Sequence, residues 1–280
     1  MKIFLKYNYN LKDPTIYKVK NNIKVKDERT RYLLCPIYKI EELEEIYQLL
    51  EQEHLQKYFY KINKNIDGQL YSTYKETNYV LLTTSNNIRT STKPLVIQRN
   101  ISGEIIKSNW KELWVKKKEY YSQIIEQSHQ DEQAQILYDY YNTMAETAIS
   151  YLPNVEQINK RQIITHRIFK QSELYKQLNL IVDIEERELA EKIRESILNK
   201  SIELNKLNDF FVSFSKNINL ELVYARLLFP NYYYDGLLKS SIDNTAFNIL
   251  IGDMTFYEAK LKELYKIFNK VQNIKKVDWL

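Results

Sequence analysis

Four polar side chains in the second half of the chain have types and spacing that could do chemistry. They are His166, Arg167, Asp183 and Glu185. The first two directly follow residues 163–165, which form a short apolar run ending in threonine, and the last two follow the apolar run 180–182.

The scarcity of glycine, histidine and cysteine excludes several other kinds of site. Only four of the 280 residues are glycine, against roughly 7% in ordinary proteins. They are Gly68, Gly103, Gly236 and Gly252. Because no two are close together, the glycine-rich phosphate loops and the Gly-x-Ser-x-Gly nucleophile elbow are absent from the sequence. Three histidines and one cysteine are too few and too scattered to predict a zinc site.

The charge balance does not favour a nucleic-acid partner. There are 41 basic and 36 acidic residues, and the densest basic run, 116–118, is interpreted as a solvated helix face. No apolar run approaches the roughly 18 residues that a membrane span needs, so we predict no membrane insertion. The first residues lack the pattern of a signal peptide, and the single Cys35 cannot form an internal disulfide. We expect synthesis in the cytoplasm.

The first third of the chain has the patterns of a small α+β lobe. Alternation around Asn21-Asn22 predicts a hairpin of strands 16–20 and 23–26. A more buried strand is predicted over 31–37, a helix over 41–57, and two further strands over 69–74 and 78–84. Asp67-Gly68 predicts the turn before the fourth strand. Five antiparallel strands and one helix are therefore expected.

The rest of the chain is predicted to be mainly helical. Apolar periodicity predicts helices, and two short apolar runs predict a strand pair at 163–165 and 178–182. The helices are expected at 109–127, 131–152, 185–199, 203–215, 219–229 and 255–273. The polar segment 85–92 is interpreted as a hinge, which divides the chain into an N-terminal lobe, 1–88, and a C-terminal lobe, 89–280.

A β-rich lobe, a hinge and a helical lobe with one strand pair form the bilobal layout of protein-kinase-like phosphotransferases. Kinases need a glycine-rich cover over the phosphates, a lysine on the third strand, a catalytic aspartate and metal-binding Asp or Asn. The loop between the first two predicted strands is Asn21-Asn22 and has no glycine. The third strand offers the apolar run Leu33-Leu34-Cys35 instead of a lysine, and Arg31 and Lys39 lie only at its ends.

The strand pair resembles the catalytic segments of the aminoglycoside phosphotransferases. Their His-Gly-Asp, followed five residues later by Asn, places His166 at the histidine and Arg167 at the glycine. Ile168 then falls at the aspartate and Glu173 at the asparagine, so the base is lost because isoleucine cannot accept a proton. Asp183-Ile184-Glu185 resembles the metal-binding Asp-Phe-Glu of the same group.

Each of these positions also has a purely structural interpretation. Asp183 precedes a predicted helix whose first turn is rich in glutamate, so its carboxylate is expected to cap that helix. His166 is expected to be a buried, hydrogen-bonded turn residue.

Longer stretches of the sequence resemble the YutH-like spore coat proteins, relatives of the CotS-type coat proteins. The most specific are Trp110-Lys111-Glu112-Leu113-Trp114 and Arg226-Leu227-Leu228-Phe229-Pro230. Residues 183–194 also follow the family's pattern, with Glu188 in place of an aspartate. The resemblance covers nearly the whole chain and implies a kinase-like protein made in the mother cell during endospore formation and placed in the coat.

Together with the missing motifs, the resemblance favours a non-catalytic pseudokinase with a structural or assembly role, which would not be an enzyme. On this hypothesis His166, Arg167, Asp183 and Glu185 are vestigial, no cofactor or metal is bound, and other spore coat proteins are the partners. A divergent small-molecule phosphotransferase using ATP and magnesium is the alternative. A third hypothesis is that the old cleft binds a partner or a small ligand.

Overall fold

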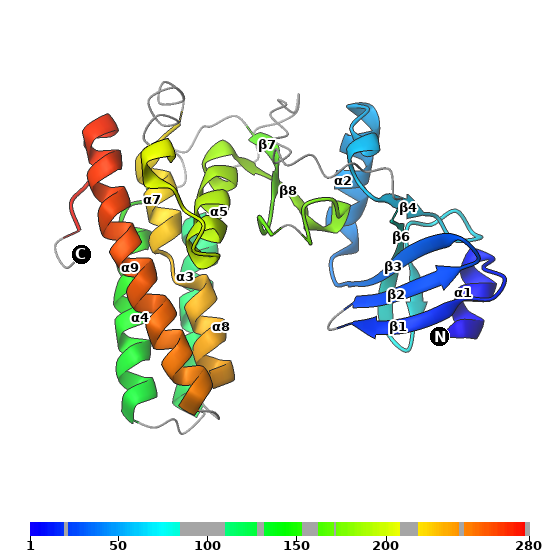
Figure 1. Cartoon of the computed structure of the whole chain (residues 1–280), viewed down its shortest axis with the longest axis horizontal. Helices are drawn as coiled ribbons and strands as arrows, with labels where there is room; N and C mark the ends of the chain where they lie inside the picture. The colour runs from blue at the N-terminus through cyan, green and yellow to red at the C-terminus, as the bar shows by residue number, and fades with distance from the viewer. Residues whose placement is uncertain are drawn as a thin grey trace. The chain divides into compact units, whose positions relative to one another are not determined.

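The computed structural model describes residues 1–19, 22–84, 110–127, 132–152, 162–170, 172–207, 218–240 and 244–277 (Figure 1). The chain divides into two compact units. The first consists of Met1–Ile97 and His166–Val182, and the second of Gln98–Thr165 and Asp183–Leu280. The predicted hinge at 85–92 lies outside the described residues, so the boundary at residue 88 stays a prediction.

The first unit is built on an antiparallel sheet of six strands. Its strands are β1 (Thr15–Val19), β2 (Asn22–Asp27), β3 (Thr30–Ile37), β4 (Lys61–Asn63), β5 (Ser72–Tyr74) and β6 (Thr77–Thr83). The order is β1-β2-β3-β6-β4, and β5 also pairs with β6. The predicted antiparallel α+β lobe is thereby confirmed. The short β4 was not predicted, and its three residues are too few to show a period of two.

A helix covers each face of this sheet, because side chains alternate along β3. Leu34 packs with Phe4 and Leu5 of α1 (Lys2–Tyr9). Leu33, Cys35 and Ile37 point the other way and pack with Leu43 of α2 (Ile40–Gln52). Helix α1 was missed in the sequence, and α2 ends earlier than predicted, before the short 3₁₀ turn η1 (Gln56–Tyr58).

The predicted turn before β5 is confirmed at Gly68. Its φ of 80° lies in the left-handed region, which glycine enters without steric cost. The side chain of the buried Asn65 accepts hydrogen bonds from the backbone N–H groups of Asp67 and Gln69, at 3.0 and 2.8 Å. The turn is therefore fixed by one glycine and one asparagine.

The second unit is mainly helical. It contains α3 (Trp110–Gln127), α4 (Glu132–Ser150), α5 (Glu185–Leu198), α7 (Leu220–Leu228), α8 (Asn231–Ser240) and α9 (Asn244–Gln272) around one apolar core. Helix α8 and the first half of α9 were not predicted. Gly236 lies where α8 meets α9, and a Cβ there would come within 2.8 Å of the Leu250 side chain. Within the described residues, no helix is long and apolar enough to cross a membrane.

The buried stripe of α3 differs from the prediction. Trp110, Trp114 and Tyr121 are buried as expected, but Leu113 is 59% exposed and Ile125 is buried in place of Ile124. The packing of Trp114 explains why the buried face of α3 is turned from the predicted one. Its ring stacks on Trp110 and on Phe229, with 5.6 and 4.5 Å between the ring centroids. The predicted strand pair is also present, as β7 (Gln162–His166) and β8 (Leu180–Ile184).

Candidate functional site

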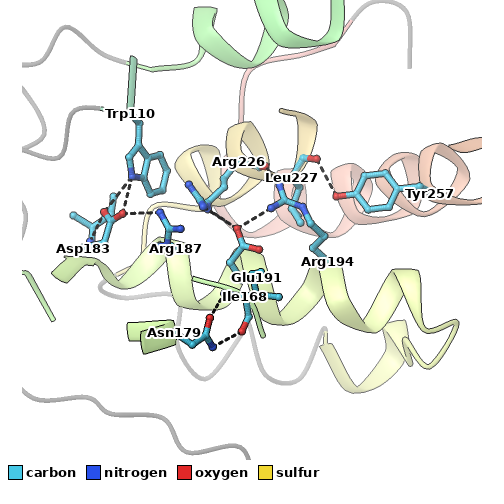
Figure 2. A network of polar contacts seen from close by, with 11 residues as sticks. Trp110, Ile168, Asn179, Asp183, Arg187, Glu191, Arg194, Arg226, Leu227 and Tyr257 are labelled. Atoms are coloured by element: carbon cyan, nitrogen blue, oxygen red, sulfur yellow. Dashed lines mark hydrogen bonds and ion pairs between the residues drawn. The ribbon is translucent and has the colours of Figure 1, made fainter. Parts of the chain in front are cut away.

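Asp183 lies on β8, two residues before α5, and its carboxylate is the polar centre of this end of the second unit (Figure 2). The side chain is buried. Trp110 Nε1 donates to both carboxylate oxygens at 3.1 and 3.0 Å, and the backbone N–H of Ile184 donates to Oδ1 at 2.8 Å. Arg187 forms an ion pair with Oδ2 at 3.0 Å. Trp110, Ile184 and Arg187 therefore all bind the same carboxylate.

The prediction that Asp183 caps α5 is wrong. The N-cap residue is Ile184, which makes no side-chain cap hydrogen bond. The Asp183 oxygens are instead taken by Trp110 and Arg187. The carboxylate still lies near the N-terminal, positive end of the α5 dipole.

A second buried carboxylate holds α5 against α7 about two turns further along (Figure 2). Glu191 Oε1 accepts from Arg194 Nη1 at 2.7 Å and from Arg226 Nε and Nη2 at 2.9 and 2.8 Å. Burial alone would raise the pKa of Glu191, but Arg194, Arg226 and Arg187 outweigh it and lower the pKa to about 2. Glu191 is therefore charged at neutral pH.

Trp110 connects the two carboxylates. Its indole N–H binds Asp183, and the Arg226 guanidinium lies over its ring, 4.8 Å from the centroid. A cation over an aromatic face is attracted by the ring quadrupole. The arginine that pairs with Glu191 thus packs on the tryptophan that holds Asp183, and α3, α5 and α7 share one polar cluster.

The stretch His166–Val182, from the last residue of β7 into β8, belongs to the first unit and contains His166 and Arg167. His166 is fully buried, its Nε2 lies 3.2 Å from the carbonyl oxygen of Leu174, and its ring contacts the Phe169 edge. The Asn179 side chain accepts from the backbone N–H of Ile168 at 3.0 Å and donates to its carbonyl at 2.8 Å. The Ile168 side chain, at the position expected for a catalytic aspartate, is 52% exposed.

Arg167 points to α2. Its guanidinium pairs with Glu42, whose other oxygen accepts from Lys39 Nζ at 2.5 Å. Partial burial raises the pKa of Glu42, but Lys39 and Arg167 outweigh burial and hold the pKa below its ordinary value. Arg31, near the start of β3, and Lys39, just beyond its end, are both exposed.

A buried cation does lie near β3, although it comes from another part of the chain. Lys176 is only 5% exposed and pairs with Glu173 at 2.8 Å. Burial raises the pKa of the Cys35 thiol to about 12, with smaller and opposite influences from Lys176 and Glu173. An ammonium group thus lies within electrostatic reach of Cys35, although the sequence of β3 itself has no lysine. Sequence inspection could not have found it, because Lys176 follows β3 by more than a hundred residues.

Of the predicted residues, His166 and Arg167 lie in the first unit, and Asp183 and Glu185 in the second. Glu185 begins α5 and is half-buried. Sequence reasoning missed Trp110, Arg187, Glu191 and Arg226 as partners in the site. The signal was present for two of them, since Asp183, Arg187 and Glu191 follow one another at i,i+4 spacing.

The described residues hold no group of three or more carboxylate, histidine or cysteine side chains that could bind a metal ion. Asp183 carries the first carboxylate of the Asp183-Ile184-Glu185 segment, which was expected from the sequence resemblance to bind a cation. The Asp183 carboxylate can hold a positive group, because the Arg187 guanidinium already pairs with it. A cation bound there would have to take the place of this guanidinium.

Comparison with known proteins identifies the family. Residues 2–274 match the family described as "Spore coat putative kinase YutH". Among curated proteins, none matches the chain significantly.

Solved structures share the fold at low sequence identity. Spectinomycin phosphotransferase APH(9)-Ia with AMP has a TM-score of 0.54 and 10% identity, over 92% of this chain and 93% of the other. Its complex with ADP and spectinomycin has a TM-score of 0.54 and 12% identity, over 92% of each chain. An aminoglycoside phosphotransferase from Alicyclobacillus acidocaldarius has a TM-score of 0.53 and 12% identity, over 94% and 95%. The predicted bilobal kinase-like class is thereby confirmed.

These findings contradict the expectation that the chain is a pseudokinase and not an enzyme. The family is described as a kinase family, and the structures with the same fold are phosphotransferases, two of them bound to AMP or ADP. The missing glycine loop, third-strand lysine and aspartate are therefore insufficient grounds for excluding enzymatic chemistry. With a matching family model over nearly its whole length and a phosphotransferase fold, the chain belongs to the YutH family of kinase-like spore coat proteins.

Proposed function

We propose that the chain is a divergent phosphotransferase of the spore coat that uses a nucleotide together with a divalent cation. The family description and the nucleotide complexes of proteins with this fold support the reaction class. The observation that carries the proposal is the buried Asp183 carboxylate, which lies on β8 just before α5 and is bound by Trp110 and Arg187.

Asp183 is the residue that would hold the cation. A cation bound to phosphate oxygens supplies charge neutralisation, which is most of what phosphoryl transfer requires of a protein. Trp110 Nε1 fixes the Asp183 carboxylate through contacts of 3.1 and 3.0 Å to its two oxygens. The carboxylate is therefore already oriented before a cation binds, and no side-chain entropy is lost in ordering it. The γ-phosphoryl group would pass from the nucleotide to an acceptor hydroxyl, with release of the diphosphate and one proton.

Arg187 is expected to compete with the cation. Its guanidinium is mostly buried and pairs with Asp183 Oδ2 at 3.0 Å, so it already neutralises the carboxylate. Cation binding must therefore displace Arg187. Replacing Arg187 by glutamine leaves Asp183 with only hydrogen bonds and should tighten cation binding.

The spore coat is the proposed place of action, with other coat proteins as the partners and acceptors. The family's description supports this location. We also propose synthesis in the mother cell, which the sequence resemblance implies.

A phosphoryl-transfer assay tests the proposal. Purified protein, ATP labelled at the γ-phosphate and magnesium are incubated with coat extract or with small hydroxyl acceptors. We expect labelled product from the native chain and from Glu146→Gln, which neutralises an exposed carboxylate paired with Lys118 at 2.8 Å. Asp183→Asn keeps the shape and the indole contact but should abolish transfer. Equal transfer by Asp183→Asn, or no transfer by the native chain with any acceptor, would contradict the proposal.

A further inference from the structure

A cavity of about 280 Å³ lies within the first unit, apart from Asp183. Its walls come from the end of β3, the first turn of α2 and the segment between β7 and β8. The apolar part of the lining includes Ile37, Leu43, Leu178 and Leu180. Such a mainly apolar space with a few polar groups is the usual composition of a small-molecule site.

The charges at the cavity do not cancel. Lys39, Glu42 and Arg167 all contribute to its lining, and both cations pair with the single carboxylate. One positive charge is therefore left over among the described lining residues. Arg167 is the better anchor of the two, since its side chain is 30% exposed against 68% for Lys39.

A buried acceptor is also left over. Gln177 lines the cavity and is only 2% exposed. Its Nε2 donates to the carbonyl oxygen of Tyr60 at 3.2 Å, which fixes the amide, and its Oε1 has no hydrogen-bond partner within the described part of the chain. Because buried polar atoms are rarely left without a partner, this acceptor of a cavity-lining residue indicates a missing donor, which would reach the buried Oε1 when the lining side chains shift.

We propose that this cavity binds a small amphipathic organic anion with an apolar body, a carboxylate for Arg167 and Lys39, and a hydrogen-bond donor for Gln177. Each part answers one observation: the leucine and isoleucine lining, the surplus positive charge and the unpaired Oε1. The proposal does not depend on phosphoryl transfer or on Asp183.

Calorimetric titration with 3-(4-hydroxyphenyl)propionate tests the site, because this acid has all three parts. Its neutral amide lacks the charge, 3-phenylpropionate lacks the phenolic donor, and acetate and inorganic phosphate lack the apolar body. We expect each of the four to bind at least about fivefold more weakly, the change that a lost hydrogen bond or charge contact of ordinary strength produces. Equal binding of the amide, or of phosphate, would overturn the proposal.

Two variants separate a binding role from a structural one. Arg167→Ala should weaken binding of the acid, whereas Glu42→Gln should tighten it by about threefold, because the cations lose their competing partner. A residue that merely held the fold together would not improve binding when its charge is removed. Lys12→Ala is the matched control, since Lys12 also pairs with a glutamate, Glu28, at 3.1 Å on the surface. Weaker binding by Glu42→Gln, or an equal loss in Lys12→Ala, refutes the assignment.

Discussion

Removing the buried charge of Glu191 should lower the denaturant concentration at which the helical unit unfolds. Glu191→Gln keeps the side chain's size but leaves Arg194 and Arg226 buried without a counter-charge. The native pKa of about 2, against 4.5 for a free glutamate, corresponds to about 3 kcal/mol at 1.36 kcal/mol per unit. Removing one partner of a buried ion pair typically costs about 3–5 kcal/mol, which agrees with the value from the pKa.

Guanidinium unfolding at pH 7, followed by fluorescence of Trp110 and Trp114 in the same core, measures this loss. The matched control is Glu146→Gln, whose exposed pair with Lys118 should contribute about 0.2–1 kcal/mol. A loss below about 1 kcal/mol for Glu191→Gln would refute the view that this carboxylate holds α5 against α7.

The difference in unfolding free energy between the native chain and Glu191→Gln should depend on pH with a defined sign. Because folding lowers the pKa of Glu191, its contribution is complete above the unfolded value of 4.5 and is lost as pH falls toward about 2. The native chain should therefore approach the stability of Glu191→Gln across this acid range. A difference that stays constant from pH 7 to pH 2 would show that the charge is not its source.

Three further predictions follow from single contacts. Trp110→Phe removes the donor to both Asp183 oxygens and should cost about 1.5–3 kcal/mol in the same unfolding assay, whereas no measurable loss would exclude the indole as a support for that carboxylate. Cys35, 3% exposed and with a pKa raised by burial to about 12, should react with a thiol reagent at pH 8 only after unfolding, and fast labelling of the native chain would contradict its placement. Gly68→Ala should lower the free energy of unfolding by about 1–2 kcal/mol because of the positive φ at Gly68, whereas Gly252→Ala, in open space on α9, should raise it by about 1 kcal/mol. Thermal melting compares the two variants, and melting temperatures that shift in the same direction would exclude the conformational explanation.

Patterns that repeat over many residues predicted most of the fold. Alternation predicted the hairpin, a short apolar run predicted β3, and apolar periodicity predicted α3, α4 and α5 within a few residues. Elements without such a repeat were missed. Gly236 and Gly252 interrupt the helical pattern of α8 and α9, and these helices form because their buried faces pack on one another. Intrinsic propensity is a weak predictor when tertiary packing opposes it.

The candidate site was only partly predictable for a related reason. Asp183 was found because a short local motif marks it. Its partner Trp110 is 73 positions away in the sequence, and Arg226 reaches the same cluster from α7. Contacts of this kind depend on how helices pack, which no local pattern encodes. Helix-capping preferences alone gave the wrong role for Asp183, because the arginine four residues later and the indole compete for its oxygens.

Magnesium-dependent ATP binding tests the central claim most directly. Thermal melting is measured with ATP alone, with magnesium alone and with both, for the native chain, Asp183→Asn and Glu146→Gln. We expect both ligands together to stabilise the native chain and Glu146→Gln, by about 2.7 kcal/mol at a hundred times the Kd, and to leave Asp183→Asn unchanged. Equal stabilisation of Asp183→Asn, or none of the native chain at millimolar nucleotide, would contradict a phosphotransferase that works through Asp183.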